Sequence, residues 1–295
     1  MNKNSERRSG YVALLGRTNV GKSTFLNAIM ETKVSIVSNK PQTTRRQILG
    51  IKTTDRGQVI FFDSPGIHKP QYRLNEKMMK DVHNSLMDAD VLLYFVDIQD
   101  KREDEFILEM LKAVKKPIFL VINKIDKLKK SKALLRMDEL KDVHTWAEIV
   151  PLSALQKINV DLLEELIFKY LPVGENFFPE EEYTSQTERF YISELVREKL
   201  LNLTRSELPF TTTVKVEEIK ERENDVHYVR AEIYVESQSQ KKIVVGKHGN
   251  LIKQIGEEAR KDIEDYYDQK VYLDLFVKVM PNWRNSPHVL HDIFD

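Results

Sequence analysis

Apolar runs and amphipathic segments alternate along the first 170 residues. Short runs of consecutive apolar residues indicate strands buried on both faces, at Tyr11–Leu15, Val91–Asp97, Pro117–Asn123 and Glu148–Pro151. Apolar positions at helical spacing predict helices over Lys22–Glu31, Asn75–Asp88, Glu103–Val114, Ser131–His144 and Asn159–Tyr170. The strands Gln47–Thr53 and Gln58–Phe62 flank a short connector with Asp and Gly, which is typical of a hairpin. This order predicts an α/β fold with a mostly parallel sheet and helices on both faces.

The pattern changes after residue 172. Pro, Gly and three consecutive glutamates mark a linker over residues 173–187. Beyond it we predict a helix, two strands, a third short apolar strand, a helix and a last strand, at Glu188–Leu203, Thr211–Ile219, Val226–Val235, Ile243–Val245, Asn250–Tyr267 and Val271–Val279. We therefore expect a flexible tail over residues 1–9, an α/β domain over 10–172 and a smaller α+β domain over 188–295.

Composition removes several classes of chemistry from consideration. The 295 residues include 46 basic and 46 acidic side chains, so net charge alone predicts neither a nucleic-acid nor a membrane partner. The absence of cysteine excludes disulfides, thiolate metal sites and cysteine nucleophiles. The apolar runs are far shorter than the roughly 20 residues that span a bilayer. We expect a soluble, cytoplasmic monomer whose membrane contacts, where they occur, are peripheral.

One segment between the first strand and the first helix matches the phosphate-binding pattern G-x-x-x-x-G-K-[ST]. Its glycines let backbone N–H groups turn toward phosphates, and the helix adds the positive end of its dipole. We expect Lys22 to reach the β- and γ-phosphates and the Ser23 hydroxyl to bind Mg²⁺. A chance glycine-rich turn is the alternative, which the flanking strand and helix disfavour. The predicted phosphate-binding residues are Gly16, Arg17, Thr18, Asn19, Val20, Gly21, Lys22, Ser23 and Thr24.

A second motif, Asp63-Ser64-Pro65-Gly66, follows another buried strand. An Asp at the carboxyl end of such a strand lies at the crevice where α/β sheets bind ligands. We expect Asp63 to hold Mg²⁺ through water and the Gly66 N–H to contact the γ-phosphate. Alone, the motif is better explained as a simple turn at the end of a strand, and its distance from the glycine-rich loop adds weight to the nucleotide interpretation.

The tetrapeptide Asn123-Lys124-Ile125-Asp126 predicts which base is bound. The Asp126 carboxylate can accept two hydrogen bonds, from N1–H and the amino group of guanine, a donor pair that adenine lacks. A site built on such paired polar groups can discriminate by about 10⁴ or more. Lys124 can lie along the base and Asn123 can brace the loop. A backbone N–H for the guanine oxygen is expected from Ser153, Ala154 and Leu155.

Together these motifs resemble those of the translation-factor-like GTPases. The resemblance implies GTP hydrolysis with Mg²⁺ and switch residues Gln42, Thr43, Thr44, Arg45, Asp63, Ser64, Pro65 and Gly66. It also implies that Thr44 completes the Mg²⁺ shell beside Ser23 and Asp63, with Thr43 as the alternative. Ile67 stands where many of these GTPases carry a glutamine that orients the attacking water.

Asn19 resembles the asparagine with which GTPases that lack this glutamine bind K⁺. The ion would supply positive charge near the phosphates. The alternative is that Asn19 only caps a turn. The catalytic residues implied by the resemblance are Lys22, Asn19, Thr44 and Gly66.

In the second domain, Gly246-Lys247-His248-Gly249 precedes a predicted helix. A G-x-x-G loop in this setting is typical of KH domains, which clamp about four nucleotides of single-stranded RNA. A tight turn is the alternative. The expected apolar groove for bases consists of Ile243, Val244, Leu251, Ile252 and Ile255. Trp283 could stack on bases beside Arg284 or belong to the core. The predicted RNA-binding residues are Lys241, Lys242, Gly246, Lys247, His248, Gly249, Lys253, Trp283 and Arg284.

Over both domains the chain resembles the Era-like GTPases, from about Gly10 onward and including Pro41–Arg45 and Pro281–Asn285. The resemblance implies binding to the 3′ end of small-subunit (16S) ribosomal RNA and a role in biogenesis of the small ribosomal subunit. For some members it also implies peripheral association with the inner membrane. The alternative is a GTPase that acts on a membrane or protein partner and uses its second domain as an adaptor.

Overall fold

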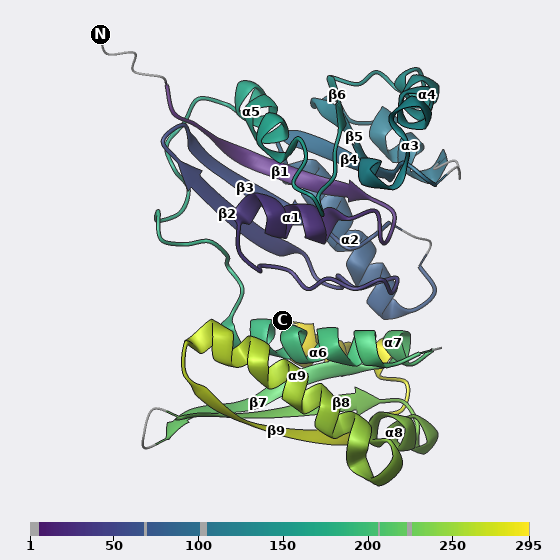
Figure 1. Cartoon of the computed structure of the whole chain (residues 1–295), viewed down its shortest axis with the longest axis vertical. Coiled ribbons are helices and arrows are strands. Elements are labelled where there is room, and N and C mark those ends of the chain that lie inside the picture. Colours follow the sequence, from purple (N-terminus) through teal and green to yellow (C-terminus); the bar gives the residue numbers. More distant parts are fainter. Residues whose placement is uncertain (1–5, 68–69, 101–104, 206, 223–225, 295) are drawn as a thin grey trace. The chain divides into compact units, whose positions relative to one another are not determined.

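The computed structural model describes residues 6–67, 70–100, 105–205, 207–222 and 226–294 (Figure 1). The chain divides into two compact units. The second unit contains residues 36–43 and 70–76 together with the chain from Gln186 onward, and the first unit contains the remainder. Of the expected flexible tail, residues 1–5 lie outside the described ranges, and Arg8 and Ser9 already belong to the first strand.

The first unit is built on a six-stranded sheet with the order β2-β3-β1-β4-β5-β6. Its strands are β1 (Arg8–Gly16), β2 (Ile48–Thr54), β3 (Gly57–Asp63), β4 (Val91–Asp97), β5 (Ile118–Asn123) and β6 (Glu148–Pro151). β2 pairs antiparallel with β3, as the predicted hairpin requires, and the other neighbours pair in parallel. The predicted mostly parallel sheet is confirmed.

Helices cover both faces of this sheet. They are α1 (Lys22–Met30), α2 (Arg73–Asp88), α3 (Glu105–Lys112), α4 (Lys130–Lys141) and α5 (Val160–Tyr170). On one face, Phe25 of α1 packs against Phe61 and Phe95 of the sheet, and α5 packs beside α1. On the other face, α2, α3 and α4 cover a cluster that includes Leu92 and Leu120. The central strands β1, β3, β4 and β5 are therefore largely buried on both sides, which explains their continuous hydrophobic runs.

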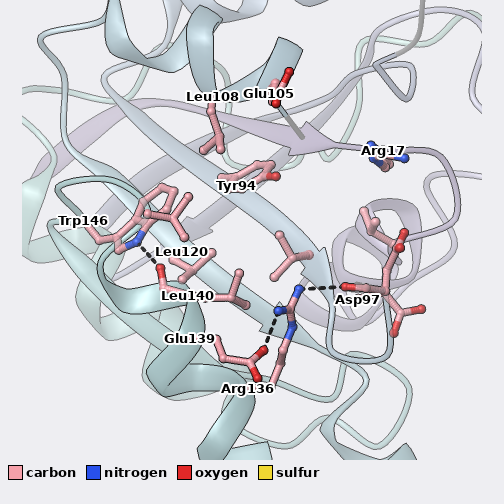
Figure 2. A pocket seen from close by; sticks show the side chains of 14 residues that line it. Arg17, Tyr94, Asp97, Glu105, Leu108, Leu120, Arg136, Glu139, Leu140 and Trp146 are labelled. Atoms are coloured by element: carbon pink, nitrogen blue, oxygen red, sulfur yellow. Dashed lines mark hydrogen bonds and ion pairs between the residues drawn. The ribbon is translucent and has the colours of Figure 1, made fainter. Parts of the chain in front are cut away.

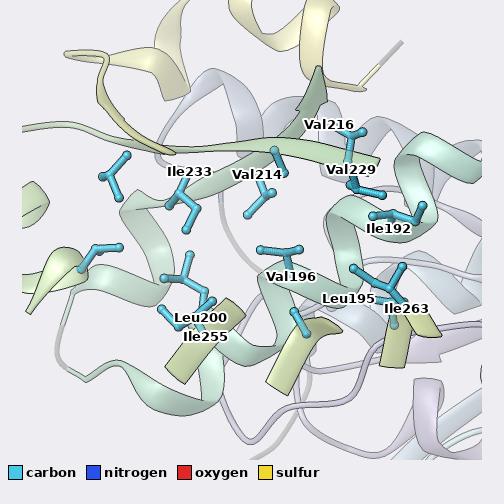
Figure 3. Packing of buried hydrophobic residues seen from close by; sticks show 14 of the residues in the cluster. Ile192, Leu195, Val196, Leu200, Val214, Val216, Val229, Ile233, Ile255 and Ile263 are labelled. Carbon is cyan, nitrogen blue, oxygen red and sulfur yellow. The ribbon is translucent and has the colours of Figure 1, made fainter. Parts of the chain in front are cut away.

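The second unit is the smaller α+β domain. Its sheet has the order β7 (Thr213–Arg222), β8 (Val226–Val235), β9 (Lys270–Val279), with β7–β8 antiparallel and β8–β9 parallel. Its helices are α6 (Glu188–Leu203), α7 (Leu208–Thr211), α8 (Gln238–Val245), α9 (Asn250–Tyr267) and α10 (Pro287–Phe294), with 3₁₀ turns at Lys247–Gly249 and Trp283–Asn285. Figure 3 shows the core, in which Leu195 and Val196 of α6 face Val214 and Val229 of the sheet.

The apolar run Ile243–Val245 is the end of a helix, and its predicted assignment as a strand is wrong. The Ser237 hydroxyl accepts a hydrogen bond from the Gln240 N–H and starts α8. Within the run only Val244 is buried, whereas Ile243 is half exposed. Three apolar residues are too few to separate a period of 3.6 from a period of 2.

Most of the predicted linker is fastened to the first unit, which extends to Ser185. The fully buried Gln58 accepts hydrogen bonds from the N–H groups of Phe177 and Phe178 and donates to the Phe178 carbonyl. Farther along, the Thr184 hydroxyl donates to the Leu49 carbonyl of β2. The expected linker of residues 173–187 is therefore largely a bound strap along the sheet.

Candidate functional site

Four parallel strands of the first sheet end at one edge. β1, β3, β4 and β5 end at Gly16, Asp63, Asp97 and Asn123, and Asp97 pairs in register with Asn123. Three of these residues open the predicted nucleotide motifs. This is the edge at which parallel sheets bind ligands.

The loop between β1 and α1 requires glycine at both ends. Gly16 has φ 138° and Gly21 has φ 98°, values that favour glycine. A Cβ at Gly16 would lie 2.4 Å from the Phe95 carbonyl oxygen, and one at Gly21 would lie 2.3 Å from the Asn123 amide nitrogen. α1 begins directly afterwards at Lys22, so its unpaired N-terminal N–H groups adjoin the loop.

Lys22 is buried inside this loop. Its ammonium donates hydrogen bonds to the carbonyls of Gly16 at 3.1 Å and Arg17 at 2.9 Å. Burial lowers the pKa of Lys22 to about 8, and the nearby Asp63 carboxylate opposes this shift. An anion placed beside Lys22 would favour its charged form, as a phosphate does in such loops.

A cluster of oxygen atoms surrounds Asp63, whose side chain is fully buried. Its Oδ2 accepts hydrogen bonds from the hydroxyls of Ser23 at 2.7 Å and Ser35 at 2.9 Å, and the Ser23 hydroxyl lies 3.0 Å from that of Thr44. Its Oδ1 is buried and has no hydrogen-bond partner among the described residues. Burial raises the pKa of Asp63, whereas the bonds to Ser23 and the charge of Lys22 act to lower it.

Thr44, and not Thr43, joins this cluster. The Thr43 hydroxyl donates instead to the Lys40 carbonyl at 2.6 Å. Ser35 was not predicted, because a serine in a loop carries no signal until the fold brings it 2.9 Å from Asp63. The two threonines are distinguished by their hydroxyl contacts, which sequence alone does not reveal.

The D-x-x-G segment packs against the phosphate loop. A Cβ at Gly66 would lie 2.5 Å from the Thr18 side chain, and the Ile67 N–H donates to the Gly16 carbonyl at 3.1 Å. Ile67 is buried in the apolar cluster. The buried Ser64 hydroxyl pairs with Ser85 at 2.7 Å, which gives it a structural contact. His68, beyond this segment, lies outside the described residues.

Asn123 connects the three segments predicted to form the nucleotide pocket. Its amide nitrogen donates to the Val20 carbonyl at 2.8 Å. Its oxygen accepts from the N–H groups of Lys124 at 2.8 Å and Ala154 at 3.0 Å. The side chain is buried, so one amide fixes the phosphate loop, its own turn and the 153–155 loop. The Ala154 N–H, one of those predicted for guanine, is therefore engaged by Asn123.

The proposed base-binding side chains are held by partners from other loops. Lys124 donates to the Asn19 carbonyl at 2.6 Å and to Asp97 at 2.8 Å. Asp126 accepts from the Ser153 hydroxyl at 2.5 Å. Leu155 is three-quarters exposed. Asp97 was missed, although it ends a buried strand as Asp63 does.

A cavity of about 450 Å³ lies beside the phosphate loop, between the sheet and the helices α3 and α4 (Figure 2). Tyr94, Leu108, Leu120 and Trp146 provide apolar surface, and Arg17, Asp97 and Arg136 contribute charge. Its lining does not include Lys22, Ser23, Asp63 or Asp126. The Arg17 side chain thus faces this separate hollow, while its carbonyl accepts from Lys22.

The G-x-x-G segment of the second unit has the positive φ angles that favour glycine. Gly246 and Gly249 have φ 76° and 78°, and His248 has φ 54°. A Cβ at Gly246 would lie 2.8 Å from that of Leu251. The side chains of Lys247 and His248 are exposed, as are those of Lys242 and Lys253. α9 begins at Asn250, directly after the loop.

A groove of about 380 Å³ lies between α9 and the edge strand β9. Its lining is Ile252, Lys253, Gly256, Glu257, Arg260, Tyr272, Leu273 and Leu275. Of the apolar residues expected to line a groove, Val244 and Ile255 are instead fully buried in the core, so that expectation is wrong for both. The contribution of β9 was missed, because the pairing of distant segments decides it.

Trp283 and Arg284 are engaged within the second unit. Trp283 is fully buried and donates to the Thr211 carbonyl at 2.9 Å, so of the two alternatives it belongs to the core, and its predicted contact with RNA is wrong. Arg284 forms two hydrogen bonds to the Glu236 carboxylate, at 2.7 and 3.1 Å. We expected the Arg284 guanidinium to stack on a base, but in the structure Glu236 already binds it.

Comparison with known families and structures agrees with this geometry. The family described as 50S ribosome-binding GTPase matches residues 11–124, and the KH domain family matches residues 207–284. The chain is 41% identical to Era from Aquifex aeolicus in a complex with GDP and AlF₄⁻, with a TM-score of 0.93 over 97% of this chain and 98% of that one. It is also 41% identical to Era in a complex with MgGDPNP and nucleotides 1506–1542 of 16S ribosomal RNA, with a TM-score of 0.93 over 98% of each chain.

Proposed function

The chain belongs to the Era family of GTPases, and from this premise we propose that it hydrolyses GTP as a switch in biogenesis of the small ribosomal subunit. Its RNA partner is the 3′ end of 16S ribosomal RNA. The Era complex that contains nucleotides 1506–1542 supports this assignment. The observation that carries the GTPase activity is a buried Asp63 oxygen that accepts no hydrogen bond from any described residue, beside Lys22 and the Ser23 hydroxyl.

The oxygen atoms near Asp63 fit a hard divalent cation such as Mg²⁺. Its Oδ1 is buried without a hydrogen-bond donor among the described residues, and two hydroxyls adjoin the carboxylate. Mg²⁺ prefers oxygen ligands and usually keeps several waters. Ser23, Thr44 and, through water, Asp63 would hold the ion, which when bound neutralises charge on the phosphates.

The protein's own groups supply binding and orientation. The loop from Gly16 to Ser23 offers its N–H groups to the phosphates, and Lys22 becomes fully charged when they arrive. The Gly66 N–H contacts the γ-phosphate, which couples this segment to the nucleotide state. Ile67 cannot orient water, so this role passes to backbone and switch groups, and Asn19 would hold a K⁺ ion whose positive charge would act near the phosphates.

Guanine is selected by the pair of hydrogen bonds that Asp126 accepts from it. The bond from Ser153 orients the Asp126 carboxylate, and Asp97 together with the Asn19 carbonyl fixes the ammonium of Lys124. Because its ammonium group is fixed, Lys124 lies with its methylene chain along the base. In the 153–155 loop the Ser153 N–H donates to the Ile158 carbonyl and the Ala154 N–H to Asn123, so we assign the guanine oxygen to the Leu155 N–H.

Phosphate release under saturating GTP tests the role of Asp63. We expect Asp63→Asn to raise the Mg²⁺ concentration for half-maximal rate by at least about tenfold, because metal-binding groups and their partners contribute at this level. The matched control is Asp55→Asn, which changes an exposed carboxylate on the same unit. An unchanged Mg²⁺ dependence in Asp63→Asn would contradict the assignment.

RNA binding is proposed for the G-x-x-G loop and the groove between α9 and β9. Exposed Lys247 and Lys253 meet phosphates, and the groove of about 380 Å³ receives bases. Fluorescence anisotropy with a labelled 16S 3′-end oligonucleotide should show salt-dependent binding that Lys247→Glu weakens. Lys169→Glu, an exposed lysine of α5, is the control. Equal affinities for both variants would favour the adaptor function over RNA binding.

The proposed location is the cytoplasm, with peripheral contact to the inner membrane, and the proposed state is a monomer. Across the ranges that the structure describes, the helices are too short or too polar to cross a bilayer. Cell fractionation with a salt wash tests this part. Protein that stays in the membrane fraction after the wash would contradict a peripheral location.

A further inference from the structure

One face of the three-stranded sheet in the second unit is turned away from the core. Along β9, Val271, Leu273, Leu275 and Val277 belong to the core with α6 and α9. Since side chains alternate along a strand, Tyr272, Asp274, Phe276 and Lys278 occupy the opposite face. Tyr228 and Arg230 of β8 pair in register with Tyr272 and Asp274. These residues form a surface that we call the open sheet face.

Two aromatic side chains of β9 are exposed on the open sheet face. Tyr272 is 56% exposed and Phe276 is 40% exposed. At one end α10 approaches this face, where Asp292 pairs with Lys215 at 2.8 Å. Lys215 shares a cross-strand row with Glu232 and Phe276, so α10 contacts the β7 edge of the face at the level of Phe276, and Tyr272 lies four residues farther along β9. Exposed aromatic residues gathered on one surface indicate a binding partner.

The rings are arranged in stacks with arginine. Tyr228 and Tyr272 stack with centroids 5.9 Å apart and an angle of 18° between their planes. The Arg222 guanidinium lies 4.1 Å from the Tyr228 ring, and that of Arg230 lies 4.7 Å from Phe276. Aromatic and guanidinium planes that are held by neighbours form platforms on which unpaired bases stack.

The many charged groups on the open sheet face suit a polar partner such as RNA better than an apolar one. The face carries the basic residues Lys215, Lys220, Arg222, Arg230 and Lys278 and the acidic residues Glu217, Glu218, Glu232 and Asp274. Glu218 pairs with Lys220 and Glu232 with Lys278, both at 2.5 Å. Asp274 accepts from the Tyr228 hydroxyl at 3.1 Å. Arg230 also lies 4.0 Å from Glu232, at the limit of an ion pair, and both arginines remain stacked on the rings, where they can contact phosphates as well as bases.

The open sheet face is continuous with the RNA groove. Tyr272 lines the groove between α9 and β9 and also belongs to the stack with Tyr228. From Tyr272 to Phe276 the strand advances about 13 Å, at about 3.3 Å per residue. We propose that single-stranded RNA leaving the groove crosses β9 and stacks its bases on the open sheet face, with Phe276 as the outer contact. This inference rests on the proposed RNA-binding function.

Two labelled RNA probes separate the groove from the open sheet face in the full-length protein. The short probe has about four nucleotides, the length that a G-x-x-G loop clamps. The long probe extends the same sequence to about twelve nucleotides, within the site sizes of single-strand platforms. Affinities are measured by fluorescence anisotropy for wild type, Phe276→Ala, Phe276→Tyr and the control Phe106→Ala, which removes a similarly exposed ring from α3.

We expect Phe276→Ala to weaken the long probe by roughly five- to 100-fold, the effect of losing one base–aromatic stack, and to leave the short probe unchanged. Phe276→Tyr keeps the ring and should restore binding, and Phe106→Ala should match wild type. Arg230→Gln, which keeps every ring, should also weaken only the long probe and serves if Phe276→Ala fails to fold.

If Phe276→Ala and Arg230→Gln lost affinity equally for both probes, or lost affinity for neither, this inference would be overturned, and the proposal of RNA binding in the groove would stand. Failure of wild type to bind either probe would overturn the proposed RNA function, and this inference with it.

Discussion

Replacing Asn123 with alanine should separate the three segments that form the nucleotide pocket. Asn123→Ala removes the bonds to the Val20 carbonyl, the Lys124 N–H and the Ala154 N–H. A backbone group that loses its partner inside a protein costs about 1 kcal/mol or more. Three such losses amount to about 3 kcal/mol, which corresponds to roughly 100-fold in an equilibrium constant.

The measurement is the affinity for fluorescent GDP, with guanidinium unfolding of the apo protein as the companion. Asn123→Ala should bind GDP roughly 100-fold more weakly and unfold at lower denaturant concentration. Asn202→Ala, which alters an exposed asparagine of α6, should match wild type in both assays. A GDP affinity for Asn123→Ala within twofold of wild type would refute the reasoning.

Three further predictions follow from single groups. Because burial lowers the pKa of Lys22 to about 8 and phosphates favour its charged form, GTP binding should take up a proton above that pH, and affinity should fall as pH rises further. Calorimetry in buffers of different ionisation enthalpy measures this proton uptake. Equal heats of GTP binding in all buffers at pH 9 would contradict the prediction. If Asn19 binds K⁺, the wild-type protein should hydrolyse GTP faster in K⁺ than in Na⁺. Equal rates in the two salts would contradict K⁺ binding at Asn19. Gln58→Ala should speed proteolytic cleavage within residues 173–185, since four hydrogen bonds of Gln58 are lost. Mass spectrometry identifies the fragments, and an unchanged cleavage pattern would show that contacts other than those of Gln58 hold this segment.

The motifs that could be predicted are contiguous in sequence and sit at strand ends. Gly16 and Gly21 mark a turn that their own backbone angles require, and Asp126 lies one short turn beyond β5. The alternating apolar runs fix the sheet because a parallel strand is buried on both faces. These features depend on local chain geometry, so their sequence signal is strong.

The residues that escaped prediction act across long separations. Ser35 reaches Asp63, and Asp97 reaches Lys124, only because the fold brings their loops together. Trp283 illustrates the opposite error, since nothing near it in sequence reveals the Thr211 carbonyl that its indole meets. Sequence patterns identify which groups are present, whereas tertiary contacts decide which of them are already engaged.

The central claim is that Asp126 selects guanine for a phosphate loop that begins at Gly16. Competition of GTP and ATP against fluorescent GDP tests it most directly, in wild type, Asp126→Asn and the exposed-carboxylate control Asp161→Asn. We predict that wild type and the control prefer GTP by about 10⁴ or more, and that Asp126→Asn loses this preference. Equal affinity of wild type for ATP and GTP, or an undiminished preference in Asp126→Asn, would contradict the account.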